Sequence, residues 1–264
     1  MKSSAVRLFT LSFLLLTLFA VGAYADSVNL FTAGSYAVLA GQTVTNTGPT
    51  VLNGDLGLSP GTSITGFPPG TVNGTINQTN GAAAQAQLDL TKAYNKAAGL
   101  SSTGSLPGIV TNGTTLTSGV YSFTSSAQLN GQLILTGKPG SLFVFQIPST
   151  LTTASASSVI FINSLTGKPM TDKNIFWQVG SSATLGTTTS FEGNILALTS
   201  ITLTTGATIT CGSALARNGA VTLDTNVITR CGGTVSTVPE PGTMGLLGTG
   251  LVILVGTARR KLRI

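Results

Sequence analysis

The chain has 264 residues and a formal net charge of +6, yet only 8% of its residues are charged. It contains no histidine, and its seven acidic residues are thinly spread, so neither the common general base nor a pair of carboxylates is indicated. We therefore expect no enzyme activity, no catalytic residue, no cofactor and no metal site. The 43 threonines and 33 glycines favour a mostly β fold that is rich in turns.

Residues 1–25 have the pattern of a secretory signal peptide. A basic start precedes an apolar run over residues 8–21, and the Ala-Tyr-Ala sequence at positions 23–25 is a small-x-small cleavage signature. The run is short for a membrane span, which argues against an uncleaved anchor. We expect signal peptidase to release a chain that begins at Asp26.

The positive charge belongs mainly to the two ends of the chain. Between residues 26 and 238 there are seven basic and six acidic residues, so the exported body is almost neutral. No basic patch with interleaved aromatic residues occurs there, and we expect no nucleic-acid partner.

Residues 31–70 have the pattern of short strands broken by glycine, asparagine and proline. We expect six of their apolar side chains to point inward: Val44, Val51, Leu52, Leu56, Leu58 and Ile64.

Residues 80–98 are predicted to form one long helix. Asn80 is suited to the N-cap, and Gly99 follows the last helical residue. The predicted apolar face consists of Ala84, Leu88, Thr91, Tyr94 and Ala98, widened by Leu90, Ala93 and Ala97. Because it has few large apolar residues, we expect the helix to lie along the β body rather than to pair with another helix.

Strands return after residue 116, and a weak internal repeat accompanies them. Small-Ala-polar segments begin at Ser126, Ser182, Gly206 and Gly219, with a looser copy at Thr153. The repeat predicts stacked coils, and its uneven length excludes regular hexapeptide coils. Apolar runs are expected to fill the interior at 142–147, 159–162, 175–179 and 195–198. Trp177 is interpreted as a core residue rather than a ligand platform.

Residues 195–224 alternate aliphatic residues with threonine, which indicates strands with one buried and one exposed side. The expected buried side consists of Ile201, Leu203, Ile209, Val221 and Leu223. The expected hydroxyl side consists of Thr202, Thr204, Thr208, Thr210 and Thr222.

Cys211 and Cys231 are the two cysteines of the chain. In an exported protein such a pair most simply forms a disulfide, which by the chain-entropy model adds on the order of 3 kcal/mol. A metal or redox thiol pair is the alternative, but it lacks the C-x-x-C spacing and histidine partners.

The C-terminal residues 238–264 resemble the PEP-CTERM sorting signal of Gram-negative bacteria. The motif Val238-Pro239-Glu240-Pro241 precedes an apolar helix over residues 244–257 and a basic tail over 258–264. The resemblance implies a transmembrane hold in the inner membrane, with the basic end in the cytoplasm, until an exosortase-type protease cuts near the motif. An ordinary tail anchor behind a proline-rich linker is the alternative.

Several blocks of the body, residues 26–237, resemble the microbial ice-binding protein family. They include VLAGQTVTNTGPTVLNGDLGLSPGTSITGFPPG, AQAQLDLTKAYN, GKPGSLFVFQI and ALARNGAVTLDTN, in the same order as in that family. The resemblance implies an irregular triangular β-solenoid with one long helix alongside. It also implies a flat face that adsorbs to ice without a chemical reaction and so inhibits its growth or recrystallisation.

Members of that family often carry Thr-Ala/Gly-x-Thr/Asn at the binding face, and residues 205–208 fit this pattern literally. Similar segments supply the other candidates. The predicted ice-binding residues are Thr205, Thr208, Ser181, Thr184, Ser125, Gln128, Thr153, Ser155 and Asn218. For Thr202, Thr204, Thr210 and Thr222, simple solvation of an exposed sheet is an equally good interpretation.

We expect a secreted or cell-surface monomer with ice as its main partner. A structural or adhesive protein of the biofilm matrix, with exopolysaccharide as partner, is the second hypothesis, although the tyrosines do not cluster as a sugar-binding face would require. A polysaccharide-cleaving β-helix enzyme is the third, and the only nearby acidic group for it is Asp172-Lys173 with Glu192.

Overall fold

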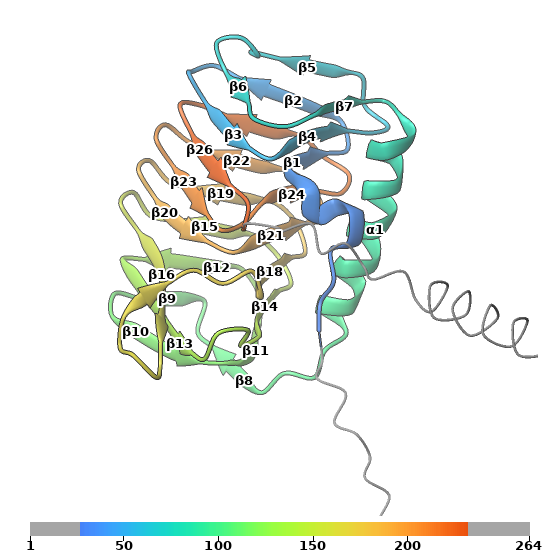
Figure 1. The fold of residues 1–264 in the computed structure, drawn as a ribbon. Helices are drawn as coiled ribbons and strands as arrows, with labels where there is room; N and C mark the ends of the chain where they lie inside the picture. Colours follow the sequence, from blue (N-terminus) through green and yellow to red (C-terminus); the bar gives the residue numbers. More distant parts are fainter. Residues whose placement is uncertain (1–26, 232–264) are drawn as a thin grey trace, which may run out of the picture.

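Three parallel sheets form the faces of a triangular solenoid, and one long helix lies along it (Figure 1). The computed structural model describes residues 27–231. Each coil of the chain passes from the first sheet to the second and then to the third, here named A, B and C. The predicted β-solenoid fold is therefore confirmed.

The strands are short, as expected for a chain that turns a corner at each edge of the triangle. Sheet A has the order β7 (Ile76–Gln78), β4 (Asp55–Leu58), β1 (Tyr36–Ala40), β24 (Ala214–Ala216), β21 (Asn194–Ala197), β18 (Ile175–Val179), β14 (Phe143–Ile147), β11 (Gly119–Phe123) and β8 (Gly104–Leu106). Sheet B has the order β5 (Ser63–Thr65), β2 (Thr43–Asn46), β25 (Val221–Leu223), β22 (Ile201–Leu203), β19 (Ala183–Leu185), β15 (Leu151–Thr153), β12 (Ala127–Asn130) and β9 (Ile109–Thr111). Sheet C has the order β10 (Thr114–Thr117), β13 (Gln132–Gly137), β16 (Ser158–Asn163), β20 (Ser190–Glu192), β23 (Thr208–Thr210), β26 (Val227–Thr229), β3 (Val51–Asn53) and β6 (Thr71–Val72), and β17 (Pro169–Met170) pairs antiparallel with β16.

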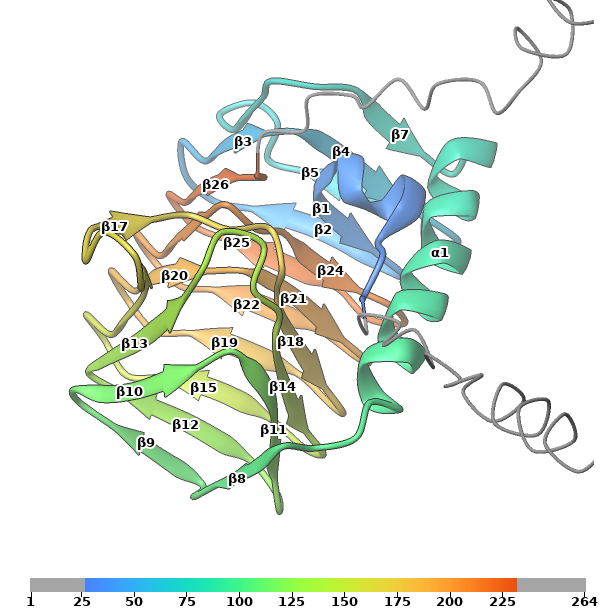
Figure 2. The same ribbon diagram turned by 60° about the horizontal axis from the view of Figure 1, so that its bottom comes forward.

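The two ends of the described chain meet inside the stack. The coil β1–β3 pairs with the last coil, since β1 lies beside β24, β2 beside β25 and β3 beside β26. The helix then carries the chain to the far end, where β8, β9 and β10 form the first coil of the returning stack (Figure 2).

Alternation along the strands builds the core. The five aliphatic residues predicted to be buried between positions 201 and 223 are each at most 1% exposed. Trp177 is also buried, stacks on Phe145 with 3.9 Å between ring centroids, and donates from Nε1 to the Glu192 carbonyl. The prediction that Trp177 is a core residue is confirmed. Among the expected inward positions of residues 31–70, Val51 and Ile64 are only partly buried.

Helix α1 (Gly81–Ala98) covers the outer side of sheet A. Asn80 caps it by accepting a hydrogen bond from the Ala83 amide, as predicted. Its buried residues are Ala83, Ala86, Asp89, Leu90, Ala93, Tyr94 and Ala97. The predicted apolar face was thus displaced by part of a turn, and Leu88 is 60% exposed. Small alanines let the helix approach the sheet closely, so alanine rather than the larger leucine marks the contact face.

Of the four apolar runs that were expected to fill the interior, 159–162 lies in β16 of sheet C, where Val159 and Phe161 do so. The other three runs, 142–147, 175–179 and 195–198, contribute side chains to both sides of sheet A. Val144, Phe176 and Leu196 alternate with interior residues and pack outward with α1 in a second core. That part of the prediction was wrong, because a strand beneath a helix is buried on both faces and loses its polar alternation.

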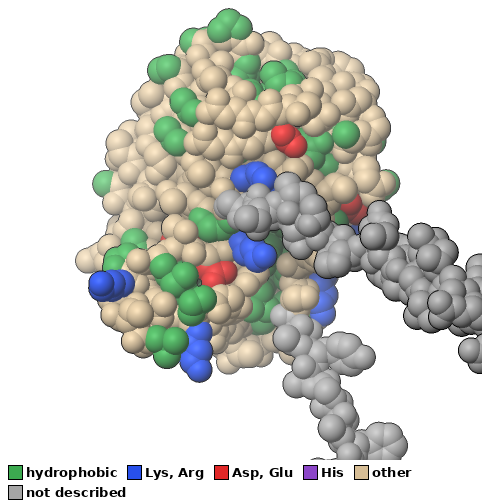
Figure 3. Space-filling model, viewed as in Figure 1, with side chains coloured by type: hydrophobic (Ala, Val, Ile, Leu, Met, Phe, Trp, Pro, Cys, Tyr) green, Lys and Arg blue, Asp and Glu red, His purple; other side chains and the backbone are tan. Residues whose placement is uncertain are grey.

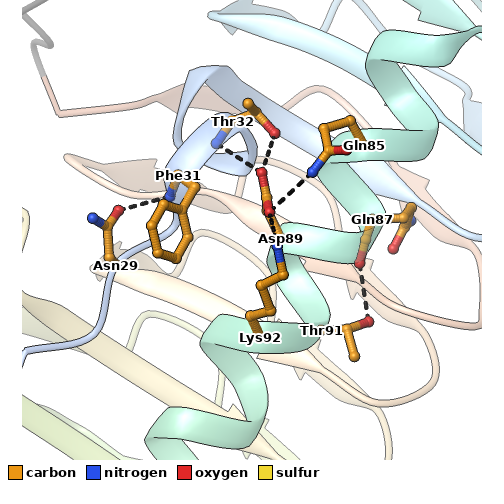
Figure 4. Close-up of polar contacts among 8 residues, drawn as sticks. All are labelled: Asn29, Phe31, Thr32, Gln85, Gln87, Asp89, Thr91 and Lys92. Carbon is orange, nitrogen blue, oxygen red and sulfur yellow. Dashed lines mark hydrogen bonds and ion pairs between the residues drawn. The ribbon is translucent and has the colours of Figure 1, made fainter. Parts of the chain in front are cut away.

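The N-terminal segment is tied to α1 through the buried carboxylate of Asp89 (Figure 4). It accepts hydrogen bonds from Thr32 Oγ1 at 2.7 Å, Lys92 Nζ at 2.9 Å and Gln85 Nε2 at 3.1 Å. Burial alone would raise the pKa of Asp89, but these donors outweigh it and lower the pKa to about 2. Asp89 therefore holds the 3₁₀ helix η1 (Phe31–Ser35) in place as an anion.

Cys211 and Cys231 form the predicted disulfide, which secures the residues that follow β26. No cluster of metal-ligating side chains occurs within residues 27–231. In the same range no helix is long and apolar enough to cross a membrane. The predicted signal peptide, the apolar segment 244–257 and the sorting motif lie outside the described residues.

The displaced helix face gives a direct test. Leu90 is fully buried against sheet A, so we expect Leu90→Ala to lower the free energy of unfolding by about 2–4 kcal/mol. The exposed Leu88 is the matched control, and Leu88→Ala should change it by less than about 0.5 kcal/mol. Urea denaturation of the two variants measures both values, and equal losses would contradict the observed packing.

Candidate functional site

A continuous row of threonines crosses the outer face of sheet B. Strand pairing aligns the six directly, one on each strand: Thr65, Thr45, Thr222, Thr202, Thr184 and Thr152. We call this row the threonine ladder. Gln128 and Ile109 continue it on the last two strands. Every ladder threonine is at least partly exposed.

The backbone fixes the geometry of the ladder. Neighbouring strands lie about 4.7–4.9 Å apart, so the six threonines span roughly 24 Å. Where the two ends of the described chain meet, the hydroxyl oxygens of Thr45 and Thr222 are 3.4 Å apart, although the residues are 177 positions apart in sequence. Threonine is stiff at χ1, so the methyl and hydroxyl groups have little freedom to disorder.

A second row of small side chains accompanies the ladder, two residues earlier in each coil, at the first residue of the strand or just before it. It consists of Ser63, Thr43, Ala220, Ser200, Ser182, Thr150 and Ser126. Several of its hydroxyls are bonded within the face: Thr150 donates to Ser126 at 2.9 Å, and Ser200 Oγ accepts from the Ala220 amide at 3.2 Å. None of the eight strands of sheet B carries a charged residue. The face is therefore regular, uncharged and internally braced.

The other two faces differ. Sheet A is covered by α1, as Figures 1 and 2 show. Sheet C presents Ile134, Ile160 and Val227 between its hydroxyl residues, and the β16–β17 hairpin projects from it. Sheet B is the open face with a single repeated side chain.

The predicted contact residues lie on two sheets and in the turns at two corners of the triangle. Thr184 and Gln128 lie in the row along sheet B, and Thr208 lies on the outer side of sheet C. The turns from sheet A to sheet B hold Ser125, Ser181 and Asn218, and the turns from sheet B to sheet C hold Ser155 and Thr205.

Thr153 is different, because it is only 7% exposed and its hydroxyl bonds to that of Thr189 at 2.7 Å. The Thr205 hydroxyl is also engaged in a hydrogen bond within the protein, because it donates to Asp224 Oδ2 at 2.5 Å. The Thr-Gly-Ala-Thr segment crosses a corner of the triangle, so its two threonines face different directions.

The sequence patterns did not indicate Thr45, Thr65 and Thr152. Thr202 and Thr222 were predicted to lie on the exposed hydroxyl side, with simple solvation as an equally good interpretation, and were not among the predicted ice-binding residues. Thr202 and Thr222 each stand at the centre of a three-residue strand, between two buried aliphatic residues. The other three do not share this pattern, because β2 and β15 each hold a second threonine and Thr65 ends β5. The repeated small-Ala-polar segment marks the entry into a strand, whichever sheet that strand joins.

Asp172 and Glu192, the acidic residues considered for catalysis, accept hydrogen bonds from backbone amides. The Asp172 carboxylate accepts from the amides of Gly140 at 2.5 Å and Asn174 at 3.0 Å. Glu192 Oε1 accepts from the Asp172 amide at 2.9 Å, and burial raises the pKa of Glu192 to about 7. These contacts join the β17 hairpin to β20.

Comparison with known proteins places this geometry in context. A family described as Ice-binding-like matches residues 38–229, and the PEP-CTERM protein-sorting motif matches residues 237–261. An ice-binding protein of Nostoc sp. (strain HG1) is 53% identical over 253 residues, covering 93% of this chain and 92% of that protein. An ice-binding protein of Flavobacterium frigoris (strain PS1) is 33% identical over 221 residues, which cover 77% of this chain and 76% of that protein.

A solved structure shares the fold. The crystal structure of an ice-binding protein from the Antarctic ascomycete Antarctomyces psychrotrophicus superposes with a TM-score of 0.73 and 41% identity. It covers 78% of this chain and 100% of that chain.

The buried Glu192 predicts a pH dependence of stability. In the folded protein the Glu192 carboxyl keeps its proton up to a pH of about 7, whereas in the unfolded chain it releases the proton near the ordinary pKa of 4.5. The contribution of Glu192 to stability is therefore fully present below pH 4.5 and is lost as the pH rises to about 7, a fall on the order of 3 kcal/mol. Denaturant unfolding at several pH values measures the fall. We expect Glu192→Gln to abolish it, and an equal fall in that variant would refute the assignment.

Proposed function

Because the chain belongs to the Ice-binding-like family, we propose that it is an exported ice-binding protein whose contact surface is the outer face of sheet B. The threonine ladder carries this proposal. It combines a flat sheet, a repeated side chain and the absence of charge on all eight strands.

The chemistry of threonine suits an ordered water layer. Each side chain offers a methyl group beside which water orders and a hydroxyl that bonds to that water. Rows about 4.7–4.9 Å apart across the strands and about 6.6 Å apart along them make a two-dimensional array. Each contact is weak, but stiff side chains lose little entropy on binding, so many contacts add up to adsorption.

Uncharged residues matter for the same reason. A charged side chain holds its own hydration shell and disturbs water ordered by its neighbours. The charged residue nearest in sequence to a ladder strand is Asp224, which follows β25 at the corner and accepts hydrogen bonds from Thr205 and Thr225. The contact is an adsorption, and we propose no chemical reaction at this face.

Export is supported by the PEP-CTERM match over residues 237–261. We propose that the body folds as a monomer in the envelope of a Gram-negative bacterium, after signal peptidase has acted. An exosortase-type protease would then act at the Val238–Pro241 motif and release the body from a transient hold in the inner membrane.

Substitution of a central ladder residue tests the proposal. Thr202→Tyr places a ring on the middle of the flat face, so its neighbours lose contact with ice. We expect thermal hysteresis to fall by at least about half, because adsorption depends on many weak contacts made together. Recrystallisation inhibition should fall in parallel.

The matched controls are Thr208→Tyr on sheet C and Thr205→Tyr at the corner. Both should keep most of the activity while circular dichroism shows that all three variants are folded. If Thr208→Tyr abolishes activity and Thr202→Tyr does not, sheet C is the contact face. If the unchanged protein neither shapes ice crystals nor slows their coarsening, the proposed ice-binding function is refuted.

The end of the ladder allows a gain of function. Gln128 aligns with Thr152 and interrupts the row with a longer, flexible side chain. Gln128→Thr extends the ladder to seven threonines, and we expect thermal hysteresis to increase. The exposed Asn130 on the same strand is the control, and Asn130→Thr should have a smaller effect. A loss of activity in Gln128→Thr would show that the glutamine itself contacts ice.

A further inference from the structure

A groove follows the corner where sheet C turns into sheet A. It consists of two adjoining cavities of about 360 Å³ each, which share Arg230. The first is lined by the N-terminal segment together with Lys173 and Asn194, and the second by Asn53, Asp55 and Asn73. In a triangular solenoid this corner lies opposite sheet B. A ligand here would leave the threonine ladder uncovered.

Two cations, Lys173 and Arg230, and no described carboxylate line the first cavity. Within residues 27–231 the one ion pair joins Lys92 to Asp89, so neither Lys173 nor Arg230 is neutralised by a described carboxylate. Arg230 donates from Nη1 to the Gly34 carbonyl at 2.8 Å, which fixes the guanidinium while its other donors remain. Basic side chains are visible near the middle of this side of the molecule in Figure 3.

The two neighbouring carboxylates are held by backbone amides rather than by these cations. The Asp172 carboxylate, next to Lys173 in sequence, accepts from two backbone amides. In the second cavity Asp55 Oδ1 accepts from the Thr75 amide at 2.8 Å. Both carboxylates keep their negative charge, but neither forms an ion pair with Lys173 or Arg230 within residues 27–231.

An aromatic ring stands at the edge of the same cavity. Phe31 is 58% exposed and has a left-handed backbone with φ of 46°, which is costly for a bulky residue. Its amide donates to Asn29 Oδ1 at 2.7 Å, and the next residue, Thr32, is held by Asp89 of α1 (Figure 4). Strain of this kind persists where the surrounding structure enforces it, and it commonly accompanies a binding role.

We propose that this groove binds an acidic saccharide, a carboxylate-bearing sugar residue within an extracellular polysaccharide. Arg230 and Lys173 would bind the carboxylate, since the guanidinium fork matches its two oxygens. The exposed ring of Phe31 suits the apolar C–H face of a sugar. Asparagine amides along both cavities supply donors and acceptors for sugar hydroxyls, and two cavities in series suit a chain rather than an isolated ion.

Calorimetric titration of the exported protein tests this proposal. The probes are an oligogalacturonate, a neutral oligosaccharide of equal length and inorganic phosphate. We expect saturable binding of the oligogalacturonate alone. Lys173→Glu should weaken it at least about tenfold, because an exposed cation becomes an anion beside the carboxylate. Phe31→Ala should weaken it as well, and neither change should alter the inhibition of ice growth.

Lys168→Glu is the matched control, because Lys168 is an exposed lysine on the β17 hairpin outside the groove. It changes the net charge equally and should alter affinity by less than about twofold. Equal weakening by Lys168→Glu would reduce the effect to general charge attraction and overturn the proposal. Absence of saturable binding, or equal binding of phosphate, would overturn it too. Loss of ice activity in the ladder variants with saccharide binding intact would separate the two sites.

Discussion

Parallel pairing of successive coils is the constraint on which the other features depend. It fixes residues of neighbouring coils at one strand spacing, about 4.7–4.9 Å, whatever their separation in sequence. The inward side chains then stack into rows, as Tyr121, Phe145 and Trp177 do on neighbouring strands of sheet A, with centroid separations of 5.8 and 3.9 Å. The outward threonines of sheet B stack by the same rule. The same strand pairing thus makes both the core and the outer surface of sheet B regular.

The three sheets share one backbone plan and differ in what covers them. Sheet A is buried on both sides because the alanines of α1 allow the helix to lie close to it. The hairpin at β17 and the buried pair of Asp172 and Glu192 occupy part of sheet C. Within residues 27–231, sheet B alone has no other element packed on its outer side, so the difference among the faces follows from where the chain places its helix and its hairpin.

The sequence was informative where a signal is local. Alternation located the buried side of residues 201–223, the N-cap located α1, and the pair of cysteines indicated the disulfide. The threonine ladder could not be predicted from local signals. Its register depends on coils of unequal length and on the pairing of Thr45 with Thr222, which are far apart in sequence. The helix face was misplaced because Leu88 has the larger side chain, while Ala86 and Ala93 make the closer contact. The resemblance to a known family supplied the triangular shape.

The meeting of the two chain ends inside the stack has a consequence for biogenesis. Strand β26 lies between β23 and β3, so the coil made from the first strands pairs with the coil made from the last. A chain that crosses a membrane from its N-terminus must therefore wait with open sheet edges until residues 214–229 have arrived. The core is therefore completed only after the last strands have crossed, and the disulfide cannot form before then, because Cys231 follows β26 in the chain.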